Sequence, residues 1–207
     1  MRFQACLLLL CALASTGVHA DDPAAMPAGT QEEIDTAAGT FYLWALNVYD
    51  GGLPSPDELA LGEALISNDL VAQLRDAWEN EQRCIEQTRL LNEAIEQPTD
   101  PEAAPTILKP PLWESHAFSV MHETPDEVIF EDIHSGEPTT VELRLLYEQS
   151  DDREGNPRPT HVGLAALEMI REDGALRVND FITRDADHGD RRLRQALETY
   201  LRETHCP

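Results

Sequence analysis

The sequence predicts an α+β fold, in which N-terminal helices pack on a curved, cone-like antiparallel sheet and a C-terminal helix closes the structure. Apolar residues recur at helical spacing in the first part of the chain, at a spacing of two after residue 111, and at helical spacing again near the end. Helices and strands that are segregated along a chain are typical of this class. Residues 30–207 contain no internal repeat, and we expect them to form one domain.

Residues 1–20 have the three-part pattern of a secretory signal peptide. Arg2 supplies the positive charge, apolar residues fill positions 5–14, and small residues precede a cleavage expected between Ala20 and Asp21. The apolar run is too short for a membrane-spanning helix, which needs about 20 residues. We therefore expect a periplasmic or secreted protein with no membrane insertion after signal removal.

The first helix is expected after a flexible leader at residues 21–29. Thr30 and Glu33 have the spacing of a capping box, in which the side chain of each residue accepts a hydrogen bond from the backbone N–H group of the other. Apolar residues then recur at helical spacing up to the glycine pair at 51–52. The helix is therefore expected to run from Thr30 to this pair.

Two more helix starts follow. Ser55 is followed by Pro56, and proline is favoured at the first position of a helix. Ser67 marks a break and a new start, after which a long amphipathic helix is expected to run to about residue 96. The proline-rich stretch at 97–111 is expected to be a connection.

Short strands are expected next, at 117–122, 128–133 and 139–148. The last of these alternates most clearly between apolar and polar residues, so that one of its faces is buried. Residues 135–138 have the composition of a hairpin turn between the last two strands.

The run at 161–171 fits either a helix or a strand. The Asp173-Gly174 pair that follows it is a tight-turn sequence, and a hairpin needs a strand on each side. We therefore predict strands before and after this pair, with Gly163 at a β-bulge. Asp190 is expected to cap a closing helix.

Two cysteines, Cys84 and Cys206, remain after signal removal. An exported protein with two cysteines is expected to form one disulfide bond, because the compartment is oxidising. The bond would attach the end of the C-terminal helix to an earlier helix. A catalytic or metal-binding thiol is the alternative, but the sequence holds no Cys-x-x-Cys pair.

The charge balance is strongly acidic: 39 Asp and Glu face 15 Lys and Arg, giving a formal net charge of −24. Such a chain is repelled by nucleic acid and by anionic membrane surfaces, so we expect neither as a partner. The apolar content of 42% favours a folded protein over a disordered one. The acidity is compatible with a basic protein partner, and it is equally explained by solubility alone.

Three segments together resemble the nuclear-transport-factor-2-like superfamily. They are Phe-Tyr-Leu-Trp at 41–44, Ile-Ser-Asn-Asp-Leu at 66–70, and the hairpin at 172–181 that begins Glu-Asp-Gly. More narrowly, the chain is similar to small uncharacterised secreted or periplasmic bacterial proteins of that group. Leu176 departs from the family pattern, which often has a tryptophan there. The resemblance implies a cone with a pocket, and the fold hosts isomerases, dehydratases, partner-binding modules and immunity proteins.

Asp180 is the strongest candidate for a catalytic residue. If Leu176, Val178 and Ile182 face the interior, a period of two places Asp180 among them. A buried carboxylate with a raised pKa is suited to act as a general base. The alternative is a structural acid that binds backbone amides or an arginine near the end of the sheet.

Metal sites are not expected. Residues 185–190 resemble a calcium loop, but the glycine is one position early and the twelfth position is Ala196 in place of the required Glu. The histidines near the predicted strands have no ligand spacing, and we interpret them as solvated or as lying at the edge of the core. They are His116, His122, His134 and His161.

The aromatic residues Tyr42, Trp44 and Tyr147 are interpreted first as core and second as pocket lining. The sequence lacks a Gly-x-Ser-x-Gly motif, a phosphate loop and a dinucleotide fingerprint. We therefore expect no cofactor, and a non-enzymatic exported binding protein whose partner is a basic protein, in the manner of an immunity protein, or an apolar small ligand. The alternative is a small cone-fold enzyme of the isomerase or dehydratase kind that uses Asp180.

Overall fold

The structure is a computed structural model. It describes residues 29–47, 51–95, 107–113, 116–121, 123–148 and 159–206. The predicted signal peptide, its cleavage point at Ala20 and Asp21 and nearly all of the leader lie outside these residues.

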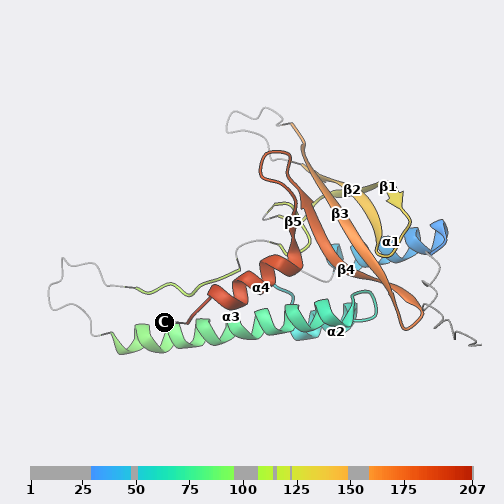
Figure 1. The fold of residues 1–207 in the computed structure, drawn as a ribbon. Coiled ribbons are helices and arrows are strands. Elements are labelled where there is room, and N and C mark those ends of the chain that lie inside the picture. The colour runs from blue at the N-terminus through green and yellow to red at the C-terminus, as the bar shows by residue number, and fades with distance from the viewer. Residues whose placement is uncertain are drawn as a thin grey trace, which may run out of the picture.

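The described residues form three helices, an antiparallel sheet and a closing helix, which confirms the α+β class (Figure 1). The elements in chain order are α1 (Gln31–Asn47), α2 (Pro56–Gly62), α3 (Asn68–Ala94), β1 (Glu127–His134), β2 (Thr139–Tyr147), β3 (His161–Glu172), β4 (Ala175–Arg184), β5 (Arg191–Arg192) and α4 (Leu193–Glu203). Neighbouring strands of the curved open sheet are also neighbours in sequence, in the order β1-β2-β3-β4-β5.

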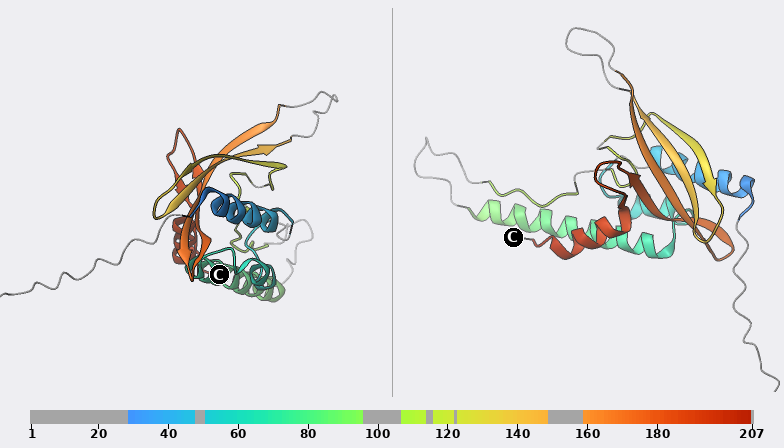
Figure 2. Two further views of the ribbon diagram at one scale, coloured as in Figure 1. Left: turned by 90° about the vertical axis from the view of Figure 1, so that its right-hand side faces the viewer. Right: turned by 45° about the horizontal axis from the view of Figure 1, so that its top comes forward.

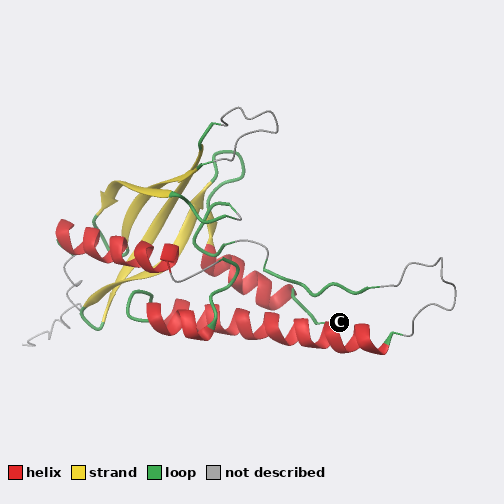
Figure 3. Ribbon diagram, turned by 180° about the vertical axis from the view of Figure 1, so that it is seen from behind, coloured by secondary structure: helices red, strands yellow, loops and turns green. Residues whose placement is uncertain are grey.

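Helix α1 lies across one face of the sheet, as Figure 3 shows from behind. Helices α3 and α4 run side by side and extend beyond the sheet (Figures 1 and 2). The loop between α2 and α3 pairs with the edge of β4, where Ser67 N donates to Val178 O at 2.9 Å and Val178 N donates to Leu65 O at 2.9 Å. This pairing covers the part of β4 that the short strand β5 does not reach.

The predicted helix starts are confirmed at α2 and α3. Ser55 and Glu58 form a complete capping box, and Ser67 Oγ accepts from Leu70 N at 3.3 Å. At α1 the box is half formed, because Thr30 Oγ1 accepts from Glu33 N but the Glu33 carboxylate binds Arg171 of β3. Both Glu33 oxygens accept from this guanidinium at 2.8 Å, a bidentate geometry that a carboxylate favours over a single amide.

The prediction that Asp190 caps the closing helix is wrong. Helix α4 begins at Leu193 with Arg192 as its N-cap residue, and the Arg192 side chain makes no capping bond. The Asp190 carboxylate instead binds the Arg184 guanidinium. A carboxylate from another element takes the capping role, as described below.

The hairpin between β3 and β4 is confirmed. Asp173 and Gly174 both have positive φ, 52° and 83°, as a two-residue turn between antiparallel strands requires. The predicted bulge at Gly163 is wrong, because Gly163 lies opposite Leu145 in an unbroken register. A Cβ atom at Gly163 would stand 2.0 Å from Val120 Cγ2, so the glycine is needed for close packing against the 116–121 segment.

The predicted strand at 117–122 is also wrong for its described part, since residues 117–121 form turns and bends. Side chains satisfy the backbone of this segment locally. His116 Nδ1 accepts from Phe118 N at 3.1 Å, and Ser119 Oγ accepts from Met121 N at 3.2 Å. The segment therefore needs no partner strand, although Phe118 is fully buried.

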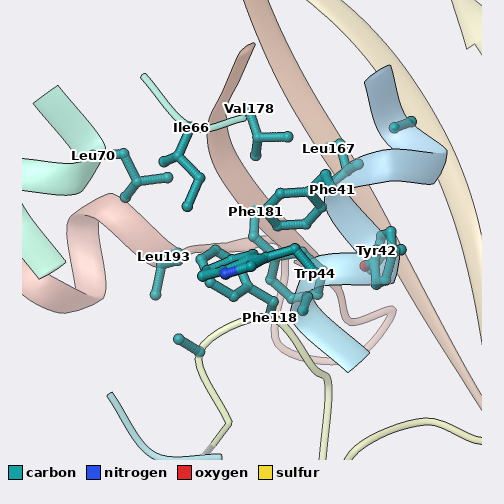
Figure 4. Packing of buried hydrophobic residues seen from close by; sticks show 14 of the residues in the cluster. Phe41, Tyr42, Trp44, Ile66, Leu70, Phe118, Leu167, Val178, Phe181 and Leu193 are labelled. Carbon is teal, nitrogen blue, oxygen red and sulfur yellow. The ribbon is translucent and has the colours of Figure 1, made fainter. Parts of the chain in front are cut away.

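The core lies between α1 and the sheet and is rich in aromatic contacts (Figure 4). The Phe118 ring packs edge-on against Phe41 of α1 at 5.0 Å between centroids and against Phe181 of β4 at 6.4 Å. Leu193, at the start of α4, is buried in the same cluster. The core thus joins the helices, the sheet and the 116–121 segment.

The predicted disulfide bond is confirmed between Cys84 and Cys206, whose Cα atoms lie 4.7 Å apart. Cys84 is fully buried in the middle of α3, and Cys206 follows the end of α4. The bond therefore fixes the C-terminus of the chain to α3. None of the helices among the described residues combines the length and apolarity needed to cross a membrane.

Candidate functional site

Asp180 lies on a different face of the sheet from the one predicted. The register pairs Met169 with Val178 and then Glu168 with Asp180, which leaves Asn179 as an extra residue on β4. Because cross-strand partners share a face, Asp180 stands with Glu168 and not with Val178. The bulge at Asn179 shifts the alternation by one residue, which a strict period of two does not anticipate.

The Asp180 carboxylate is 2% exposed and its oxygens are bound. Oδ1 accepts from the backbone N–H groups of Phe181 at 3.0 Å and Arg194 at 3.1 Å, and Oδ2 accepts from Arg192 Nη1 at 3.1 Å. Burial raises the pKa of Asp180, while the N–H group of Arg194 and the Arg192 guanidinium act in the opposite direction. Asp180 therefore supplies from β4 the N-terminal cap of α4 that its own N-cap residue lacks.

The three aromatic residues weighed as pocket lining all lie in the core cluster. Trp44 Nε1 donates to Glu58 O at 3.1 Å. The Tyr147 hydroxyl lies 2.7 Å from Ser119 Oγ and accepts from Val120 N at 3.2 Å. The Tyr42 hydroxyl is buried without a hydrogen-bond partner among the described residues, and its burial raises the pKa of Tyr42 well above the usual value. Their role as pocket lining stays a prediction.

The histidines predicted to be solvated or at the core edge are dispersed. His134 lies opposite Thr140 and His161 opposite Tyr147, at the two ends of β2, while His122 lies outside the described residues. Within the described part of the chain, no three His, Cys, Asp or Glu side chains are grouped as a metal site requires. Asp185, in the loop that resembles a calcium site, accepts from the N–H groups of Asp187 and His188, which lower its pKa.

A cavity of about 550 Å³ lies where the 116–121 segment, β4, β5 and the start of α4 meet. We call it the β5–α4 cavity. Seven of the twelve residues that line it are apolar: Trp113, Ala117, Val120, Met121, Phe181, Leu193 and Ala196. The volume falls within the range of about 300–1,000 Å³ that small-molecule pockets occupy.

Helices α3 and α4 position the Trp113 side of this wall. Trp113 N donates to Glu81 Oε1 of α3 at 2.6 Å, and the Trp113 ring packs edge-on against Tyr200 of α4 at 5.5 Å. Near the start of the 107–113 segment, Leu108 N donates to Asn92 Oδ1 of α3 at 2.8 Å, and Asn92 Nδ2 donates to Leu108 O at 3.0 Å. The segment is therefore tied to α3 at two points.

The polar residues that line the cavity are His116, Ser119 and Thr183, together with Arg191, whose side chain is 68% exposed, and Arg192. A second cavity of about 530 Å³ also borders Arg191 and Arg192, so both arginines lie between two hollows. The Ser119 hydroxyl already donates to Glu123 O at 2.7 Å. The lining thus combines apolar side chains with several polar groups and one exposed guanidinium, that of Arg191.

His116 is a buried base in the cavity wall, 3% exposed. Burial lowers the pKa of His116 to about 4, so the imidazole is neutral at pH 7. The cavity wall therefore carries no histidine charge at neutral pH.

We expect His116 to make the protein less stable in acid. Because the unfolded pKa is about 6.5, the unfolded state binds the proton first as the pH falls. The contribution of neutral His116 is complete above pH 6.5 and is lost towards pH 4, by up to about 3 kcal/mol. Urea unfolding of the wild type and of His116→Asn, which keeps an acceptor for Phe118 N, measures the difference. Parallel stability curves for the two proteins would contradict this assignment.

The β5–α4 cavity could not be predicted from the sequence, although the sequence holds one signal for it. Arg191, Arg192 and Arg194 fall within four residues of a chain that has 15 basic residues in all. A cluster of arginines in an acidic protein indicates a candidate binding site, but only the fold shows that Arg191 and Arg192 lie beside Trp113 and Phe181. Comparison of the chain with protein-family models, curated proteins and solved structures finds no match.

Proposed function

We propose that this protein is an exported, non-enzymatic binding protein that holds an apolar small ligand in the β5–α4 cavity. The observation that carries the proposal is the cavity itself, about 550 Å³ in volume and walled by apolar side chains such as Trp113, Phe181 and Leu193. Ligand pockets are typically apolar concavities with a few placed polar groups.

Two features support export. The sequence pattern of residues 1–20 is that of a signal peptide. The Cys84–Cys206 bond is a disulfide, and disulfides persist in oxidising compartments. The same bond holds α4, and with it Ala196, against α3 at one side of the cavity.

The contacts of Asp180 favour binding over catalysis. A general base must reach a substrate proton, and the Asp180 oxygens already accept from Phe181, Arg192 and Arg194. The enzyme hypothesis depends on this carboxylate, so it has less support than the binding hypothesis. The basic protein partner, which follows from the net charge alone, stays a prediction.

A pocket-filling variant tests the proposal. Ala196 is exposed on α4 and lines the cavity, so Ala196→Trp should occupy it without disturbing the core. We expect isothermal titration with decanol and with decanoate to detect binding to the wild type, and Ala196→Trp to weaken it by about tenfold or more.

Ala72→Trp is the matched control, because Ala72 is also an exposed helical alanine and lies on α3 outside the cavity lining. Its affinity for both probes should equal that of the wild type. The proposal is overturned if neither probe binds, or if Ala196→Trp binds them as tightly as Ala72→Trp does.

A further inference from the structure

Arg191 is the arginine of β5 that faces the β5–α4 cavity. The register places Arg191 opposite Thr183 and Arg192 opposite Ile182. Cross-strand partners share a face, and Thr183 lines the cavity whereas Ile182 does not. Arg191 therefore lies on the cavity face of the strand, and the Arg192 head group is directed to the opposite face.

The neighbouring arginines are engaged in the fold. Arg192 Nη1 donates to Glu168 Oε2 at 2.9 Å and to Asp180 Oδ2 at 3.1 Å. Arg194 Nη1 donates to Asn179 Oδ1 at 2.8 Å. These contacts hold both guanidinium groups against the sheet.

Arg191 differs from both. Its side chain is 68% exposed, and its ion pair with Asp185 Oδ2 spans 3.9 Å, beyond hydrogen-bond distance. Asp185 itself is bound by the N–H groups of Asp187 and His188. The other acid that borders Arg191, Asp190, is paired with Arg184. Among the described residues, Arg191 is thus an exposed cation beside the cavity, and its two acidic neighbours Asp185 and Asp190 both have closer partners.

We infer that the ligand of the β5–α4 cavity is an anionic amphiphile: an apolar body that the cavity wall encloses, with a carboxylate that the Arg191 guanidinium binds. This inference rests on the proposed function and specifies its ligand class. A guanidinium presents paired N–H donors that match the two oxygens of a carboxylate.

The composition of the wall distinguishes this class from strongly polar anions. Phe181 and Leu193 offer no hydrogen bonds that replace the hydration of a sugar or a nucleotide. The Trp113 indole N–H, which is buried without a hydrogen-bond partner among the described residues, is a single donor and cannot replace such a hydration shell. The N-terminus of α4 is not the anion site, because the Asp180 carboxylate already accepts from the N–H group of Arg194 there. One cationic group beside one apolar wall matches a ligand with one charged end.

The test compares two probes that share a chain and differ in the head group. We expect the wild type to bind decanoate about tenfold more tightly than decanol at pH 7 and low salt, each kept below its micelle-forming concentration. Arg191→Gln should reduce the decanoate affinity to that of decanol and leave the decanol affinity unchanged. Arg202→Gln is the matched control, since Arg202 is equally exposed on α4 but borders neither cavity.

The outcomes separate the two proposals. Equal binding of decanol and decanoate by the wild type would overturn the anion inference and leave the binding function standing. An equal loss of decanoate affinity in Arg191→Gln and Arg202→Gln would also overturn it, because net charge alone would then explain the preference. Binding of neither probe would overturn the proposed function and this inference together.

Discussion

Replacing Cys84 and Cys206 together by alanine is expected to lower the free energy of unfolding by about 4–5 kcal/mol. The bond joins residues 122 positions apart, so its loss lets the unfolded chain sample many more conformations. Urea denaturation of the double variant and of the wild type at neutral pH measures the difference. This loss is a large fraction of the stability of a typical domain, which is about 5–15 kcal/mol.

Reduction of the wild type provides the control for this prediction. It removes the bond but keeps both sulfur atoms, so it separates loss of the cross-link from the small cavity that alanine leaves at the buried Cys84. We expect the reduced wild type to lose nearly as much stability as the double variant. A loss below about 1 kcal/mol in both would show that the bond contributes little to the fold.

Asp180→Ala is expected to cost about 2–4 kcal/mol, because it removes a helix cap and a charged partner at a buried position. The N–H group of Arg194 and the guanidinium of Arg192 would lose their acceptor. Thermal or urea unfolding measures the cost. Asp76→Ala, on the exposed surface of α3, controls for the loss of one negative charge.

Asp180→Asn should lose less stability than Asp180→Ala. The amide oxygen still accepts from the N–H groups of Phe181 and Arg194. Burial raises the pKa of Asp180, which means that the ionised form is the costlier one to bury. If Asp180→Ala is as stable as Asp76→Ala, or more stable than the wild type, the residue is not structural, and the enzyme hypothesis regains its support.

Several parts of this fold were predictable because they depend on short stretches of sequence. Ser55 and Ser67 cap helices within their own turns, and Asp173-Gly174 forms its hairpin turn through the positive φ angles that this pair tolerates. The disulfide followed from counting the cysteines outside the predicted signal peptide. Each of these signals lies within a few residues or depends on composition.

The errors arose where a distant residue replaces a local partner. Asp190 has the sequence of a cap, but Arg184 binds it, and Asp180 caps α4 from a neighbouring strand. Residues 117–121 have the apolar composition of a short strand, but the Tyr147 hydroxyl of β2 accepts from Val120 N and Ser119 Oγ accepts from Met121 N, so these N–H groups do not pair with a strand. Such competition between partners depends on three-dimensional proximity, which the sequence does not display.

The sequence by itself determined most of the elements and their order: the starts of α2 and α3, the β3–β4 hairpin and the α+β class follow from local spacing and turn chemistry. Only the tertiary structure decided which side chains share a face and what they surround. One extra residue at Asn179 moves Asp180 from the face of Val178 to the face of Glu168, where it is still buried and caps α4. The pairing of β5 with β4 then places Arg191 beside the cavity. Both outcomes depend on strand register, which is set by packing between residues that are far apart in the chain.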